Sequence, residues 1–391
     1  MSALRRSRLW VTVAATSLAA LLAACGSGGA NGGSGTGDTA SPVRVGVITS
    51  LSGPLSDYGK QVQDGLRAGL ACSTNGTNAV NGHPVTFDVK DDGGDAATAQ
   101  SLATGMVGEG ITILTGSANS GIAPQLGQFA QQQGVLYIAS AVGSDKLTGL
   151  NANTFRATRQ ASQEAMALTS VLPGGTGKVA VLAQDYALGQ GYVASIKKIL
   201  PNAQVEPVLV PLDAREFTPY AQKVASLKPD LLVVVYYGDT AAAVWQSLLQ
   251  QGVTDTTPIA SLLGQRSSWG IYGAAAPKIT FVAHDFAGQD TRTATNDCLL
   301  KESPNADEST FNGFVSAQMI VHALTVAGAD DVEGMKKALD GYSFEAPKGK
   351  VTIRSGDHAL IQDMLVVSLT TENGKPTAKL VKTVPAADLT P

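Results

Sequence analysis

The sequence is poor in charged residues and has no run of basic residues in its main part. Charged residues make up 15% of the 391 residues, against 44% hydrophobic residues, so there is ample apolar material for buried cores. The formal net charge is −4, and three of the 28 basic residues fall within the first ten positions. Nucleic-acid binding needs clustered Lys and Arg to neutralise phosphates. The composition therefore largely excludes nucleic-acid proteins, and it excludes polytopic membrane proteins as well.

The sequence also lacks the motifs that carry enzyme chemistry. It has no Gly-x-Ser-x-Gly elbow and no phosphate-binding P-loop, and Gly189-Gln190-Gly191 lacks the third glycine of a dinucleotide fingerprint. The four histidines are isolated, without the spacing of paired metal ligands: His83, His284, His322 and His358. We therefore expect a protein that is not an enzyme and that uses no metal or other cofactor.

Only three cysteines are present, and the first follows a segment typical of a signal peptide. Arginines precede an uncharged, apolar stretch at 9–24, which at about 1.5 Å per residue is too short to span a membrane core of about 30 Å. The stretch ends in Leu-Ala-Ala-Cys at Cys25, which resembles the bacterial lipobox, whose cysteine carries lipid. We predict a lipoprotein signal peptide at 1–24 and lipidation of Cys25. The alternative is an ordinary signal peptide followed by a chance cysteine.

The segment after Cys25 has no large side chains to bury. Residues 26–37 are all Gly, Ser, Ala, Asn or Thr, so we predict a flexible tether at 25–42. Lipid and tether together would hold the body at the extracytoplasmic face of the cell membrane. Lipidation leaves Cys72 and Cys298, which either pair in this oxidising compartment or remain two separate thiols.

The main part of the chain alternates short apolar runs with helical periods. Strands are expected at 43–48, 85–90, 111–114, 135–138, 179–182, 205–210, 231–236, 259–263, 279–282, 350–353 and 364–369. Segments between them show helical spacing, as at Val62, Leu66 and Leu70. Such alternation implies parallel sheets covered on both faces. Because the series restarts near 179 and each series is too short for an eight-unit barrel, we predict an α/β fold with two doubly wound parallel-sheet lobes.

The loops that follow the predicted strands combine glycine with hydroxyl or amide side chains. The loops at 49–59, 115–121 and 139–144 each lie just before a predicted helix. Helix N-termini with such residues bind carboxylates and other anions, although the same residues also serve as helix caps and turns. Ligands of doubly wound sheets bind beyond the carboxyl ends of the strands. Three such loops at one sheet edge favour a site for a small polar molecule.

Eight short segments carry recognisable motifs in a fixed order, at 45–47, 51–54, 58–59, 81–85, 91–93, 189–191, 350–352 and 357–358. Their order and spacing resemble those of the leucine/isoleucine/valine-binding family of periplasmic binding proteins, over about residues 43–370. The resemblance implies a type I periplasmic binding fold, in which two lobes joined by a three-stranded hinge close on a ligand. It also implies the role of extracytoplasmic receptor for an ATP-driven importer.

The resemblance further implies where the chain passes between the lobes. The three crossings would lie near 156–160, 284–287 and 344–348. Lobe one would comprise 43–157 and 286–344, and lobe two would comprise 158–285 and 345–385. Cys72 and Cys298 would then lie in the same lobe, which makes their pairing possible.

The polar loops and the resemblance together indicate ligand-binding residues on both lobes. Lobe one would supply Ser52, Tyr58, Asn119, Ser120, Ala141 and Gly143, and lobe two Tyr186, Tyr236, Asp239 and Gln265. Gly143 departs from the hydroxyl residue often found at that position in the family. Arg266 would either meet a second ligand carboxylate or lie exposed on the surface.

One acidic residue of the family's amino-acid binders is missing. Those proteins place a glutamate after the strand predicted at 259–263 to hold the ligand ammonium, and this chain has Gly264 and Gln265 there. A buried ammonium without a counter-charge is costly. Unless Asp239 or Asp285 substitutes, we expect a ligand other than an α-amino acid.

We therefore expect an extracytoplasmic solute-binding lipoprotein of an ABC importer. It would capture a small polar metabolite, amino-acid-like, an amide or a small carboxylate, by hinged closure. Its partners would be this ligand, the permease subunits and the membrane that holds its lipid anchor. A second hypothesis is a ligand sensor that signals to a membrane partner without transport. A third, a secreted enzyme, is disfavoured because no nucleophile–base motif is recognisable.

Overall fold

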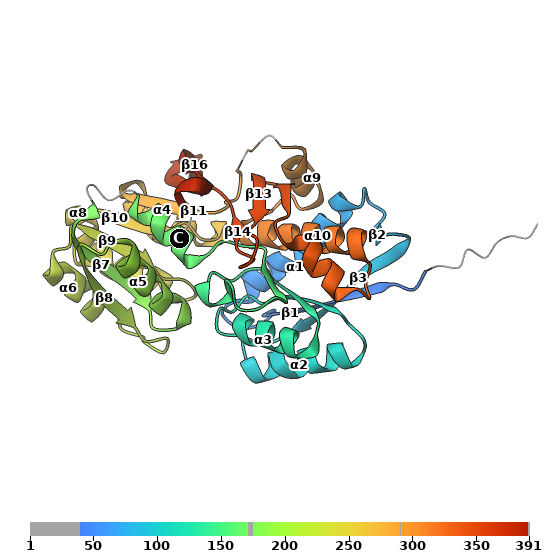
Figure 1. Ribbon diagram of the computed structural model, residues 1–391. Helices are drawn as coiled ribbons and strands as arrows, with labels where there is room; N and C mark the ends of the chain where they lie inside the picture. Colours follow the sequence, from blue (N-terminus) through green and yellow to red (C-terminus); the bar gives the residue numbers. More distant parts are fainter. Residues whose placement is uncertain (1–39, 171–174, 290, 292, 390–391) are drawn as a thin grey trace, which may run out of the picture. The chain divides into compact units, whose positions relative to one another are not determined.

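The computed structural model describes residues 40–170, 175–289, 291 and 293–389. The predicted signal peptide at 1–24, the predicted lipidation site Cys25 and most of the predicted tether at 25–42 lie outside the described residues. Among the helices of the described part, none is long and apolar enough to cross a membrane. The body is built on two large sheets with separate hydrophobic cores, which we call lobe one (six strands) and lobe two (seven strands) (Figure 1).

Lobe one has the strand order β2-β3-β1-β4-β5-β6, and all neighbouring strands are parallel except β2 and β3. The strands are β1 (Val43–Thr49), β2 (Ala79–Val80), β3 (His83–Asp91), β4 (Ile113–Gly116), β5 (Leu136–Ala139) and β6 (Thr154–Arg156). The helices are α1 (Ser56–Ser73), α2 (Ala96–Gly108), α3 (Ala123–Gln133), α9 (Ala294–Glu302), α10 (Glu308–Ala327) and α11 (Val332–Leu339), with the short helix η1 (Asp145–Leu147).

Side chains alternate between the two faces of this sheet, and both faces are covered. Val47 and Ile113 pack toward α1 and α10, whereas their chain neighbours Ile48 and Leu114 pack toward α2 and α3. Helices α2 and α3 lie on one side of β1, and α1 and α10 lie on the other (Figure 1). Full burial on both sides explains why these strands are continuous apolar runs.

Helices α1 and α10 approach closely because glycines face each other across the contact. A Cβ added at Gly65 would lie 2.0 Å from the Thr310 carbonyl oxygen, and one at Gly313 would lie 2.2 Å from that of Val62. A disulfide between Cys72 and Cys298 joins the end of α1 to α9. The first helix of the described chain is therefore fixed to segments that come more than two hundred residues later.

Lobe two has the order β16-β15-β11-β10-β9-β7-β8, and all neighbouring strands are parallel except that β15 is antiparallel to both β11 and β16. Its strands are β7 (Gly177–Gln184), β8 (Ala203–Val210), β9 (Leu231–Val235), β10 (Ile259–Leu262), β11 (Ile279–Ala283), β15 (Met364–Glu372) and β16 (Lys375–Val384). Its helices are α4 (Ala161–Thr169), α5 (Ala187–Ile199), α6 (Thr218–Leu227), α7 (Ala241–Gln250), α8 (Val253–Thr256), η3 (Arg266–Lys278) and η4 (Ala386–Leu389).

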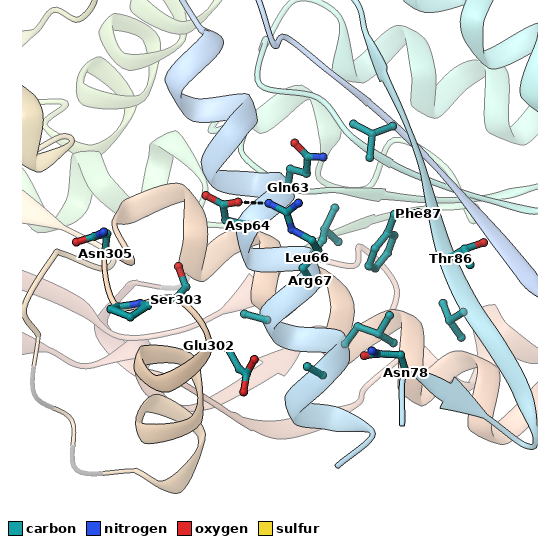
Figure 2. Close-up of a pocket in the computed structure, with 16 residues that line it drawn as sticks. Gln63, Asp64, Leu66, Arg67, Asn78, Thr86, Phe87, Glu302, Ser303 and Asn305 are labelled. Carbon is teal, nitrogen blue, oxygen red and sulfur yellow. Dashed lines mark hydrogen bonds and ion pairs between the residues drawn. The ribbon is translucent and has the colours of Figure 1, made fainter. Parts of the chain in front are cut away.

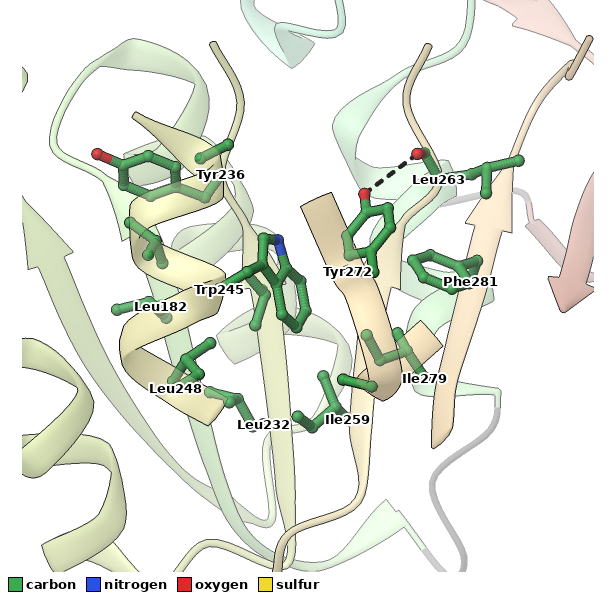
Figure 3. Packing of buried hydrophobic residues seen from close by; sticks show 14 of the residues in the cluster. Leu182, Leu232, Tyr236, Trp245, Leu248, Ile259, Leu263, Tyr272, Ile279 and Phe281 are labelled. Carbon is green, nitrogen blue, oxygen red and sulfur yellow. Dashed lines mark hydrogen bonds between the residues drawn. The ribbon is translucent and has the colours of Figure 1, made fainter. Parts of the chain in front are cut away.

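Aromatic rings fill one face of the lobe-two core (Figure 3). Trp245 and Tyr272 meet edge to face with ring centroids 5.0 Å apart, and Tyr272 meets Phe281 at 4.7 Å. The Tyr272 hydroxyl donates a hydrogen bond to the Leu263 carbonyl at 3.2 Å (Figure 3). Helix η3 is thereby fixed against β10 and β11, so the loop that follows β10 has a rigid support.

A small third sheet changes the expected division between the lobes. Strands β12 (Ser343–Ala346), β13 (Gly349–Ile353) and β14 (Leu360–Ile361) are antiparallel to one another, and their buried apolar side chains join the lobe-one core. From the sequence we expected residues 345–361 to belong to lobe two. In the structure they pack on lobe one instead. In the structure the chain passes between lobes between β6 and α4, between β11 and α9, and between β14 and β15.

Candidate functional site

Two adjoining cavities are lined by residues of both lobes. The smaller, about 50 Å³, is lined by Ser120, Arg159 and Glu308 among others, and we call it the charged cavity. The larger, about 190 Å³, is bordered by four tyrosines, and we call it the tyrosine cavity. Tyr58 and Tyr237 line both cavities, so the two cavities lie next to each other.

Eight of the ten ligand-binding residues predicted from the sequence line one or both of these cavities. The charged cavity receives Tyr58, Ser120, Ala141, Gly143 and Tyr186. The tyrosine cavity receives Tyr58, Tyr236, Asp239 and Gln265. These residues come from loops after β4, β5, β9 and β10 and from the segments that begin α1 and α5. The carboxyl ends of the parallel strands thus form this region, as the fold class predicts.

Ser52 and Asn119 were predicted to bind ligand, but they line neither cavity. Ser52 is exposed, and its hydroxyl hydrogen-bonds to Asp91. The Asn119 carbonyl oxygen accepts a hydrogen bond from the Gly121 amide at 2.8 Å. Both side chains hold loops of lobe one in place, Ser52 through Asp91 at the end of β3 and Asn119 through Gly121 and the Gly94 carbonyl.

Buried polar contacts hold the lobe-one loops in place. The carboxylate of Asp92 accepts hydrogen bonds from Ser50 at 2.6 Å and from Ser117 at 3.1 Å. The Tyr137 hydroxyl donates to the Gly116 carbonyl at 2.8 Å. This network joins the ends of β1 and β4, so Ser120 projects from a loop that is itself fixed.

Arg159 enters the charged cavity beside Gly143. It lies in the crossing between β6 and α4, it is only 6% exposed, and its Nε lies 2.9 Å from Glu164 Oε1. A Cβ added at Gly143 would lie 3.3 Å from both Cζ and Nη1 of Arg159. The glycine that departs from the family pattern therefore leaves room for a guanidinium, a group that recognises carboxylates well.

A second carboxylate, Glu308, faces the same arginine. Its Oε1 lies 3.8 Å from Arg159 Nη2 and 3.8 Å from His284 Nδ1, and its Oε2 is buried without a hydrogen-bond partner. Burial raises the pKa of Glu308 to about 8. The pKa of Glu164 is held below its ordinary value by Arg159 and His284 despite burial. The two glutamates therefore differ in charge state around one guanidinium.

A second buried ion pair joins the crossing between β11 and α9 to the turn between β12 and β13. Lys348 Nζ lies 3.2 Å from Asp285 Oδ2 and also donates to the His284 carbonyl. Burial raises the pKa of Asp285 to about 6 and lowers the pKa of His284 to about 3. His284 is therefore neutral near pH 7, and Asp285 and Lys348 form their own pair.

Several cavity residues were missing from the sequence-based prediction. In the charged cavity they are Leu55, Ala118, Arg159, Leu188 and Glu308. Arg159 lies within the crossing predicted at 156–160. A charged residue in a predicted hinge between two lobes could have indicated a ligand-binding role. Glu308 begins a strongly apolar helix and gave no local sign of its role. Arg266 lines neither cavity, and its amide and guanidinium instead contact Asp307 and Ala306.

The described residues contain no group of three or more His, Cys, Asp or Glu side chains arranged to hold a metal ion. The site therefore offers hydrogen bonds, charge and aromatic surface. Such a constellation can bind and orient a small polar molecule.

A larger groove of about 810 Å³ lies on lobe one (Figure 2). It is lined by α1, by β3 and by 302–305, and it contains none of the predicted ligand-binding residues. Two of its three charged residues, Arg67 and Asp64, pair with each other (Figure 2). It lies along the length of β3, away from the strand ends where both lobes contribute, and we do not assign the ligand to it.

Residues 42–375 match the model of a family described as periplasmic binding protein. Leu/Ile/Val-binding protein BraC3 of Rhizobium johnstonii is 28% identical over 326 residues, covering 79% of this chain and 87% of that protein. Leu/Ile/Val-binding protein homolog 3 of Brucella melitensis is 26% identical over 321 residues, covering 79% and 86%.

Solved structures share the fold. An ABC-transporter solute-binding protein of Rhodopseudomonas palustris HaA2, in complex with p-hydroxybenzoic acid, has a TM-score of 0.80 at 21% identity, covering 88% of this chain and 97% of that one. An ABC-type branched-chain amino acid transporter protein of Rhodopseudomonas palustris CGA009 has a TM-score of 0.75 at 23% identity, covering 88% and 97%.

Proposed function

The chain belongs to the periplasmic binding protein family, and from this premise we propose that it is the extracytoplasmic solute-binding protein of an ABC importer. It captures a small polar molecule between its lobes, and closure about the three crossings presents the loaded protein to the permease. The relatives named for Leu, Ile and Val and the neighbour bound to p-hydroxybenzoic acid support small amino acids and carboxylates as the first candidates.

The observation that carries this proposal is the charged cavity. Lobe one contributes Ser120 and Glu308, lobe two contributes Tyr186 and Tyr237, and Arg159 reaches it from a crossing. A ligand there touches both lobes and a segment that joins them. Binding energy then depends on how the lobes are placed, which is the requirement for a ligand to shift a conformational equilibrium.

We also propose that Cys25 is lipidated and that residues 25–42 tether the body to the cell membrane. The support is the charge pattern, the short apolar stretch and the Leu-Ala-Ala-Cys sequence. Replacing Cys25 by Ala would release the protein from the membrane fraction into the medium. Retention of the Cys25→Ala protein in washed membranes would contradict the anchor.

Thermal unfolding of the full chain in detergent tests the solute-binding role. Amino acids, amides, ureas and small carboxylates are each added at millimolar concentration. A ligand present at about 100 times its Kd stabilises the folded state by about 2.7 kcal/mol, which is readily measured. The control variant Arg67→Gln, in the groove of lobe one, should show the same ligand-induced rise in unfolding temperature as the parent. The variant Arg159→Gln should lose this rise. A screen without any shift would contradict the proposed function.

A further inference from the structure

Glu308 is the one carboxylate around the charged cavity without a hydrogen bond or a close counter-charge among the described residues. The residue is 7% exposed, and its Oε2 lies buried without a partner. Its nearest basic groups, Arg159 Nη2 and His284 Nδ1, are each 3.8 Å from Oε1, beyond hydrogen-bond distance. A buried charge left in this state is costly unless something else meets it.

The neighbouring charged groups are already matched to one another. Arg159 pairs with Glu164 at 2.9 Å, and Lys348 pairs with Asp285 at 3.2 Å. Asp307, next to Glu308, accepts backbone N–H bonds from Glu308 and Arg266 at 2.9 and 2.8 Å. The other titratable groups that face Glu308 are His284 and the tyrosines Tyr58, Tyr237 and Tyr272. When Glu308 is ionised, its negative charge is therefore the one in this cluster of buried residues that has no counter-charge of its own.

We infer that the Glu308 carboxylate accepts a hydrogen bond from an N–H group of the ligand, so that the protein selects small solutes carrying an ammonium, amidinium or carboxamide group over simple carboxylate anions. This inference rests on the proposed function and narrows its ligand class. An ammonium or amidinium supplies the missing positive charge, and a carboxamide supplies a donor without adding negative charge. A simple carboxylate adds a second unmatched anion to the same cavity.

The rest of the cavity accommodates the other end of such a molecule. Arg159 beside Gly143, together with Ser120, offers a cation and a hydroxyl. Although the charge of Arg159 is shared with Glu164, its guanidinium and the Ser120 hydroxyl are hydrogen-bond donors for the carboxylate end of a zwitterion, while Glu308 accepts from the N–H end. The acid that the sequence lacks after β10 is supplied from a different element, the first residue of α10.

The charge state of Glu308 gives a second signature of the same contact. Burial raises its pKa to about 8, so a substantial part of the ligand-free protein carries the proton at pH 7. A cationic N–H group placed against the carboxylate favours its ionised form. Binding of such a ligand then releases protons to the buffer, and the amount released falls as the pH rises above 8.

The test uses pairs of probes that differ in the N–H group, with the full chain in detergent. The pairs are L-leucine with 4-methylpentanoate, 4-aminobutanoate with pentanoate, and isobutyramide with isobutyrate. Titration calorimetry at pH 8 measures each affinity for the parent protein, for Glu308→Gln and for the control Glu302→Gln in the lobe-one groove. Two buffers of different ionisation enthalpy measure the protons released.

We expect the N–H member of at least one pair to bind at least about tenfold more tightly than its partner. Glu308→Gln should weaken an ammonium probe by at least about tenfold and abolish proton release, and Glu302→Gln should change neither. Equal or tighter binding of the carboxylate members, or an unchanged affinity in Glu308→Gln, overturns the inference and leaves the solute-binding role intact. Absence of binding by every probe and by every compound of the wider screen overturns both.

Discussion

The guanidinium of Arg159 occupies the space next to position 143 that a side chain there would fill. A Cβ at Gly143 would lie 3.3 Å from Cζ and Nη1 of Arg159 and 3.4 Å from Leu188 Cδ1. A residue from a crossing, a loop of lobe one and the start of α5 therefore meet at one point. The missing side chain at position 143 is part of how the arginine reaches the cavity.

Gly143→Ala is expected to weaken ligand binding with little effect on stability. The added methyl group forces the guanidinium to move by a few tenths of an ångström, which disturbs its geometry toward a ligand. We expect a loss of affinity of about fivefold or more and a stability change within about 1 kcal/mol. Gly191→Ala is the control, because a Cβ there meets nothing within 4 Å. Equal affinities of Gly143→Ala and the parent would contradict the role of this glycine.

Glu308 makes the stability of the ligand-free protein fall as the pH rises. Its pKa is raised to about 8, so the folded protein holds this proton more tightly than the unfolded chain. Its contribution is complete below about pH 4.5 and is lost as the pH rises through 8. Glu308→Gln resembles the protonated form, so its advantage over the parent in the free energy of unfolding should grow between pH 5 and pH 9, reaching more than about 1 kcal/mol, and its Tm should rise relative to the parent accordingly.

His284 acts in the opposite direction but does not obscure that comparison. Its pKa is lowered to about 3, so its contribution is present above about pH 6.5 and is lost as the pH falls. Because both proteins carry His284, its effect largely cancels in the difference between them. A difference in Tm that stays constant from pH 5 to pH 9 would show that Glu308 titrates normally.

Gly65→Ala is expected to be strongly destabilising. A Cβ at Gly65 would lie 2.0 Å from the Thr310 backbone oxygen, so α1 and α10 would have to separate. We expect a loss of at least about 3 kcal/mol in the free energy of unfolding, measured with urea. Gly105→Ala, at an open helical position in α2, should instead gain about 0.5–1 kcal/mol. Similar effects of the two changes would rule out the close helix contact.

The disulfide between Cys72 and Cys298 should stabilise lobe one substantially. It closes a loop with a sequence separation of 226, which restricts the unfolded chain. Replacing both cysteines by Ala should lower the free energy of unfolding by about 3–5 kcal/mol. Adding dithiothreitol should lower the stability of the parent and leave the double variant unchanged. A parent protein insensitive to reductant under unfolding conditions would speak against the bond.

Much of the fold could be predicted because buried parallel strands are conspicuous in a sequence. The run Leu231–Val235 is apolar throughout, and all five of its residues are buried, as expected for a strand in a sheet that is covered on both faces. Asp95 directly precedes α2, and its side chain accepts a hydrogen bond from the Thr98 amide at 2.7 Å, as the acidic residue before a helix commonly does. The edge strand β16, at Lys375–Val384, was missed because most of its side chains are exposed and its composition is polar.

The boundary of the lobes and part of the site could not be predicted for a different reason. The alternating apolar residues Val351 and Ile353 show that one face of β13 is buried. They do not show which lobe covers that face, because both lobes have apolar cores. Likewise, Glu308 reaches the cavity only because α10 is fixed against α1. The loops after strands were predictable, since the fold class alone places them at one edge.

Lobe one is assembled from two separate stretches of the chain, with lobe two in between. Helix α1 cannot bury its glycine-lined face until α10 is available, and α10 leaves the ribosome only after all of β7 to β11. A growing chain therefore holds its first third in an incomplete state for most of its synthesis. In the exported lipoprotein that we propose, this order of segments delays compaction of the chain until most of it has been made.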